Sequence, residues 1–221
     1  MKKYAILSFV SAAAMLLPGA PVEISFRAGA WKTNDFTVVK SPRLEYVRGF
    51  LQEKDCIVNP CPDLPDEEIF KKHSNEVYAA TVWKEKIPLG RTVAARMGFD
   101  HRMAPLIVIA PELGTDASGR PEFREHWEIV LFDEGLNVWH HHFKDGKPSW
   151  HKAAFVKTPY LPKTVYDLSV KIEKTGKGHR QMTVSCGGTT LGYADMDLPD
   201  SFYAGVIGCE GRNRFYDFRV K

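Results

Sequence analysis

Apolar side chains recur at every second position in short segments along most of the chain, a pattern typical of β-strands with one buried face. No apolar repeat of helical period persists beyond the first twenty residues. Turn sequences such as Lys144-Asp145-Gly146-Lys147 separate many of the segments. The predicted strands are 22–26, 36–40, 44–51, 77–83, 92–99, 106–109, 127–132, 138–143, 153–156, 165–173, 181–186, 205–208 and 215–220. So many short strands predict an all-β fold, a sandwich of two antiparallel sheets.

One segment, residues 63–74, departs from this pattern. Three acidic residues, Asp66, Glu67 and Glu68, precede the apolar pair Ile69-Phe70 and follow a proline-rich loop. Acidic residues are typical of the first turn of a helix, so we expect one short surface helix here.

The first twenty residues have the composition of a secretory signal. Two lysines precede an apolar run from Tyr4 to Leu17, and small residues follow as far as Ala20. We therefore expect a signal peptide over 1–20, a single domain over 21–221, and a secreted or periplasmic protein. The cut site stays open between Ala20 and a position near Ala14. The apolar run is short for a membrane helix, so no span is expected after signal removal.

Charge and cysteine content narrow the partners and the compartment. The formal net charge of +3 falls to +1 when the two lysines of the signal are removed, which does not favour nucleic acid as a partner. Four cysteines in an exported chain, Cys56, Cys61, Cys186 and Cys209, predict two disulfides. Pairing in chain order is one of three connectivities, and free buried thiols are the alternative.

Three tryptophan–histidine pairs lie within 26 residues: His126-Trp127, Trp139-His140 and Trp150-His151. Their spacing matches that of successive antiparallel strands. Flat apolar rings beside hydrogen-bonding imidazoles suit a sugar, which has an apolar ring face and a rim of hydroxyls. The same side chains would also serve as an ordinary core with polar edges.

Side chains alternate across a strand, so position parity predicts which of them share a face. Trp127, Ile129 and Leu131 fit the core face, which leaves His126 and Glu128 on the other. If Trp139 and Phe143 also face the core, His140 and His142 join Glu128 on the open face. The predicted sugar-binding residues are Arg96, His126, Glu128, His140, His142, Trp150 and His151. A His-x-His pair ligates a metal only with a third ligand in reach, and we predict no metal site on this basis.

Four segments close the chain in a characteristic order: 166–173 contains Y-x-L-x-V, 181–188 ends in a glycine turn, 203–211 contains G-x-I-G, and 215–220 has the form F-x-D-F-x-V. This order resembles the closing strands of concanavalin A-like (laminin G-like, jelly-roll) domains. Cys186-Gly187 stands where that superfamily usually has Asp-Gly or Asn-Gly. The resemblance implies a β-sandwich and, as a class, lectins, carbohydrate-binding modules, glycoside hydrolases and polysaccharide lyases.

These inferences together predict an exported protein that recognises a poly- or oligosaccharide on its concave sheet. One alternative is a polysaccharide lyase or glycoside hydrolase in the same groove, with Glu128, His140 and His142 as catalytic candidates. Another is a laminin G-like protein-interaction domain. The segment from Glu128 to Glu134 begins and ends like a glucanase motif, but Val130 replaces its central aspartate. No cofactor is expected, and structural calcium is left open at the loop acids Asp116, Asp133-Glu134 and Asp195-Met196-Asp197.

Overall fold

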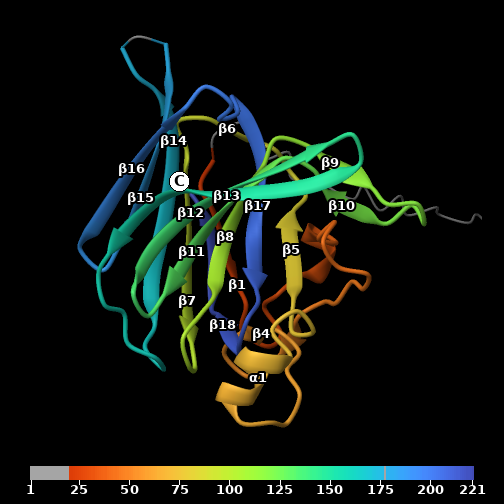
Figure 1. Ribbon diagram of the computed structural model, residues 1–221. Helices are drawn as coiled ribbons and strands as arrows, with labels where there is room; N and C mark the ends of the chain where they lie inside the picture. Colours follow the sequence, from red (N-terminus) through yellow and green to blue (C-terminus); the bar gives the residue numbers. More distant parts are fainter. Residues whose placement is uncertain (1–19, 177) are drawn as a thin grey trace, which may run out of the picture.

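The computed structural model describes residues 20–176 and 178–221, and the predicted signal lies outside these ranges except for Ala20. Figure 1 shows two large antiparallel sheets stacked face to face, with the helix α1 (Asp66–Lys72) at one end. Within the described ranges, no helix has the length and apolar character needed to cross a bilayer. The two-sheet all-β sandwich predicted from the sequence is confirmed.

The first sheet has nine strands and contains both ends of the described chain. The main path of this sheet runs in the order β16 (Thr189–Asp195), β15 (Arg180–Cys186), β14 (Tyr166–Lys174), β7 (Thr92–Phe99), β18 (Asn213–Phe215), β4 (Ile57–Val58), β3 (Leu51–Gln52). In addition, β19 (Asp217–Val220) pairs with β7 and with β1 (Val22–Ser25).

The second sheet has eight strands and carries the tryptophan–histidine pairs. The main path runs in the order β13 (Lys147–Lys157), β12 (Gly135–Lys144), β11 (His126–Phe132), β8 (Pro105–Ala110), β17 (Ser201–Gly208), β5 (Ala79–Trp83), β2 (Phe36–Val38). The short β6 (Ile87–Pro88) pairs with β17, and β9 (Leu113–Thr115) pairs with β10 (Pro121–Phe123) in a separate ribbon. A 3₁₀ turn over Thr33–Asp35 precedes β2.

Apolar side chains cover both faces of the eight-stranded sheet. Its inner face packs against the nine-stranded sheet, where Trp127 and Ile129 of β11 belong to one buried cluster with Leu168 of β14. Its outer face carries a second buried cluster that includes Val108 and Val130. Leu44 from a loop and Phe123 from β10 pack on this outer cluster. Two of its members, Leu106 and Val130, also line a pocket.

The β12–β13 hairpin sets the register of the site. Its turn residues Asp145 and Gly146 have φ values of 51° and 75°, the left-handed pair that a type I′ turn requires. Val138 pairs with Ala154 while Trp139 pairs with Lys152, so Ala153 is an extra residue in a β-bulge. The strand β13 forms one edge of the sheet.

Most predicted elements are present, and the differences have local causes. The helix predicted within 63–74 is α1, and β7 has the predicted bounds. The predicted strand 44–51 forms a ladder only from Leu51, since Leu44 instead packs on the outer cluster from a loop. The strand β16 was missed because glycine and threonine dilute its apolar alternation.

The structure corrects the predicted disulfides, since all four cysteines are free thiols. Cys186 lies in the core between the sheets, whereas Cys209 packs on the outer cluster, so the two face different layers. Cys56 points its sulfur at Glu53, and the sulfur of Cys61 faces the Gly211 carbonyl. Burial raises the pKa of Cys56 to about 12 and that of Cys186 to about 11, so both thiols stay protonated at neutral pH.

Candidate functional site

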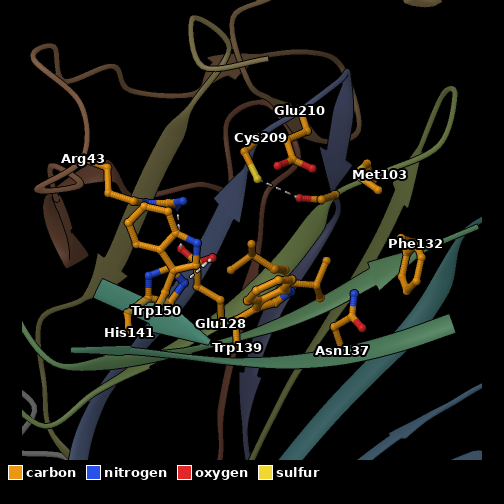
Figure 2. Close-up of a pocket in the computed structure, with 13 residues that line it drawn as sticks. Arg43, Met103, Glu128, Phe132, Asn137, Trp139, His141, Trp150, Cys209 and Glu210 are labelled. Atoms are coloured by element: carbon orange, nitrogen blue, oxygen red, sulfur yellow. Dashed lines mark hydrogen bonds and ion pairs between the residues drawn. The ribbon is translucent and has the colours of Figure 1, made fainter. Parts of the chain in front are cut away.

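A pocket opens on the outer face of the eight-stranded sheet, where β11, β12 and β13 meet the loop that contains Arg43 (Figure 2). Its volume is about 160 Å³. A cavity of about 150 Å³ holds a benzene ring, so this one has room for a single six-membered ring. We call it the outer pocket.

Glu128 is the charged centre of the outer pocket. It is 6% exposed, and its carboxylate lies 3.1 Å from Nε2 of His141, 3.6 Å from Nε2 of His126 and 3.7 Å from Nη2 of Arg43. Burial alone would raise the pKa of Glu128, but the two imidazoles and the guanidinium outweigh it and hold the pKa well below its usual range. Glu128 therefore remains an ionised hydrogen-bond acceptor at neutral pH.

Strand register builds a column of stacked rings beside this carboxylate. His126 lies directly opposite His141, and His141 lies directly opposite Trp150. The ring centroids are 4.8 Å apart for Phe123 and His126, 4.4 Å for His126 and His141, and 6.1 Å for His141 and Trp150. The Arg43 guanidinium lies 5.0 Å from the Trp150 ring centroid, at the distance of a cation–π contact. Each member of the column thus limits the motion of the next.

Two tryptophans line the outer pocket, and two side-chain oxygens of its lining residues have no hydrogen-bond partner. Trp139 lies opposite Glu128 in the ladder, and Trp150 is 49% exposed. Among the described residues, Oε1 of Glu128 and Oδ1 of Asn137 are buried without a hydrogen bond. The buried hydroxyl of Tyr78 is also unpartnered, and it lines an adjoining hollow. Buried polar groups are normally paired, so these oxygens are available to bond a hydroxyl group that enters the pocket.

A second carboxyl group lies at the rim of the pocket. Glu210 is exposed as a residue, yet its carboxyl group is directed toward the cavity in Figure 2. Its surroundings raise its pKa, chiefly by withdrawing it from water and secondly through the charge of Glu128, while Arg43 opposes the shift. Two carboxyl groups whose surroundings shift their pKa values in opposite directions can divide acid and base roles.

Two of the predicted site residues, Glu128 and Trp150, line the outer pocket. A third, His126, is buried beside Glu128 but does not line the cavity. Arg96 does not join them, because it lies on β7 in the other sheet, where Nε is 2.6 Å from Oδ2 of Asp217. The prediction that Arg96 shares one open sheet face with Glu128 is therefore wrong.

His140, His142 and His151 also lie outside the pocket, on the opposite face of β12 and β13. The parity prediction for β12 was inverted, because Trp139 faces outward and His140 faces inward, where it stacks on Trp127 with 4.3 Å between ring centroids. The pairing of Glu128 with Trp139 and of Trp127 with His140 fixes this arrangement.

Arg43, Asn137, Trp139, His141 and Glu210 were missed as site residues. Three of them would have been identified if the two faces of β12 had been assigned correctly. Asn137, Trp139 and His141 are every second residue of β12 and share its outer face. Arg43 and Glu210 enter from segments outside the strands, where no periodic signal marks the direction of a side chain.

Two sets of three side chains have the spacing of metal ligands: His126–Glu128–His141 and His140–His142–His151, with ligand atoms within 4.8 Å of one another in each. The first set does not fit a dication well, since the Arg43 guanidinium already lies beside Glu128. The calcium alternative has little support at Asp116, whose carboxylate accepts hydrogen bonds from the backbone N–H groups of Ser118 and Arg120 and from the Arg120 side chain.

No protein-family model matches this chain, and no curated protein matches its sequence. Solved structures do match its fold. The carbohydrate-binding module CBM66 from Bacillus subtilis is 9% identical with a TM-score of 0.54, over 82% of this chain and 92% of that one. The kappa-carrageenase from Pseudoalteromonas carrageenovora, in complex with an oligotetrasaccharide of kappa-carrageenan, is 8% identical with a TM-score of 0.54, over 94% and 97%. The Emp46p carbohydrate recognition domain, in a metal-free form, is 8% identical with a TM-score of 0.54, over 85% and 88%. This chain has the concanavalin A-like jelly-roll fold, as its closing strands predicted.

Proposed function

We propose that this protein binds a poly- or oligosaccharide in the outer pocket. The observation that carries the proposal is the pairing of two indoles, Trp139 and Trp150, with unpartnered acceptors on Glu128 and Asn137 in a cavity of single-ring size. A sugar ring offers the complementary surface, an apolar face with hydroxyls around it. The carbohydrate-binding module, the recognition domain and the carrageenase that share this fold are consistent with it.

In this proposal the polar residues fix the orientation of the bound sugar. The ionised Glu128 accepts hydrogen bonds from hydroxyls, and such charge-assisted bonds are stronger than neutral ones. Arg43 is held from two sides, by Glu128 and by the Trp150 ring, so little side-chain freedom is lost on binding. We also infer that the protein works outside the cytoplasm, on the support of the lysine-led apolar run at its N-terminus.

A glycan array followed by calorimetric titration of the selected saccharide tests the proposal. We expect Trp150→Ala to weaken affinity about tenfold, equivalent to ~1.4 kcal/mol, because it removes stacking surface and the support of Arg43. Phe155→Ala is the matched control, since Phe155 is 42% exposed on the same strand but does not line the pocket. An array without a bound glycan, or equal affinities for the two variants, would overturn the proposal.

A glycoside-cleaving enzyme is the second candidate, favoured by two carboxyl groups in one pocket whose pKa values are shifted in opposite directions. Glycoside hydrolysis uses such a pair. The protein-interaction alternative gains no comparable support, since it predicts a surface without a sugar-sized cleft.

If Glu210 donates a proton, turnover requires its protonated form and falls as the pH rises through its raised pKa. Glu210→Gln should then abolish turnover but change saccharide affinity by no more than about twofold, because the amide preserves the shape of the side chain. Release of reducing ends measures hydrolysis, and absorbance of an unsaturated uronate measures lyase activity. A protein that binds the saccharide and forms neither product is a binder.

A further inference from the structure

Three imidazoles converge on the inner face of β12 and β13, on the other side of β12 from the outer pocket. His140 lies directly opposite His151 in the ladder, and His142 lies two residues further on the same face. The ring centroids are 3.9 Å apart for His140 and His142, 5.4 Å for His142 and His151, and 5.5 Å for His140 and His151. One ligand atom from each ring lies within 4.8 Å of the other two.

A carboxylate lies against two of these rings. Oε1 of Glu125 is 2.9 Å from Nε2 of His140 and 3.6 Å from Nδ1 of His142. In the described chain, Glu125 has no ion pair with a lysine or arginine. Its charge is therefore available to a cation that these imidazoles bind.

A second carboxylate supports His140 from its other side. Oδ2 of Asp195, on β16 of the facing sheet, lies 3.5 Å from Nδ1 of His140. Asp195 is itself fixed by the Tyr193 hydroxyl and by the backbone N–H of Asp197. A carboxylate on the second nitrogen of a metal-binding histidine orients the ring and makes it a better ligand.

We propose that His140, His142, His151 and Glu125 bind one divalent transition-metal ion of the Zn²⁺ type. Three imidazoles and one carboxylate are four donors, the number that tetrahedral Zn²⁺ takes, and imidazole suits zinc, nickel and copper rather than calcium. Donor atoms around tetrahedral zinc lie roughly 3.3 Å apart, as follows from metal–ligand distances of about 2.0–2.1 Å. His142 is half-buried and His151 is exposed, so small rotations of these two rings can close the remaining gap.

The ion would join adjacent strands at an edge of the sheet. His140 and His151 belong to β12 and β13, whose opposite faces present His141 and Trp150 to the outer pocket. Cross-linking the hairpin at these positions would hold the register that places Trp150 beside His141.

Titration of the full chain with Zn²⁺, in competition with a chromophoric chelator, tests this site. We expect one Zn²⁺ per chain, and Co²⁺ in its place should show the intense visible bands of four-coordinate cobalt. His142→Ala and His151→Ala should each weaken Zn²⁺ affinity by more than about tenfold, since loss of a supporting residue alone costs about 10–100-fold. Neither ring is buried, so both variants should fold. Asp195→Asn should weaken binding within that same range.

His179→Ala is the control, since His179 is exposed and belongs to neither histidine cluster. It should bind Zn²⁺ as the wild type does. Absence of Zn²⁺ binding, or binding that survives both His142→Ala and His151→Ala, would overturn the proposal. So would binding that is lost only in His126→Ala, because the ion would then occupy the outer pocket.

Discussion

Glu128→Gln should weaken saccharide binding about 30-fold or more while the protein remains folded. Glu128 is the anion around which His126, His141 and Arg43 are arranged. The amide has nearly the same shape but no charge, so it loses its ion pair with Arg43 and accepts weaker hydrogen bonds from a sugar. Truncating one member of a buried charged pair at an interface costs at least ~2 kcal/mol, which is the stated 30-fold.

Glu122→Gln is the matched control for this prediction. Glu122 is another buried glutamate, 6% exposed, and its carboxylate lies 2.8 Å from the Lys40 ammonium and also pairs with Arg124. It does not line the outer pocket. Calorimetry should therefore show unchanged affinity for Glu122→Gln. Equal loss of affinity in both variants would show that the effect comes from lost stability and not from the pocket.

Trp127→Ala should lower the free energy of unfolding by ~3–5 kcal/mol, the usual cost of removing a large buried aromatic side chain. Trp127 has no exposed surface and packs between the sheets, with the His140 ring stacked on its indole. Since domains are stable by only about 5–15 kcal/mol, this is a large share of the total. Denaturant unfolding followed by far-ultraviolet circular dichroism measures it.

Trp150→Ala serves as the comparison for Trp127→Ala, because it removes the same side chain from a half-exposed position. We expect its unfolding free energy to change by less than about 1 kcal/mol, since little apolar surface leaves the core. Similar destabilisation of both variants would contradict the assignment of the two tryptophans to different faces.

Local patterns in the sequence were sufficient to predict β7, the helix α1 and the two faces of β11. β7 was predicted to the residue because apolar side chains occupy every second position from Val93 to Phe99. The helix was predicted within 63–74 because acidic residues fill its first turn. In β11, the contrast between Trp127, Ile129 and the charged Glu128 fixed the correct faces. These are local signals, and they need no knowledge of the rest of the fold.

The faces of β12 could not be assigned in this way. Its central residues are Trp139, three successive histidines and Phe143. Neither of the two sets of alternate residues is therefore distinctly more apolar than the other. Only pairing with β11 decides the matter, because it places His140 on Trp127. His151 became a candidate third ligand for the His-x-His pair only when the hairpin register placed it opposite His140. Arg43 and Glu210 depend on loop paths that no periodicity describes.

The edge position of β13 has a consequence for the behaviour of this protein at high concentration. An edge strand of eleven residues exposes backbone donors and acceptors that could recruit a strand from another molecule and begin aggregation. This strand contains three lysines, one proline (Pro148) and a β-bulge at Ala153. Charge, a missing N–H group and a local twist each disfavour such strand addition. The edge that carries Trp150 is therefore protected against self-association while its side chains stay accessible from solution.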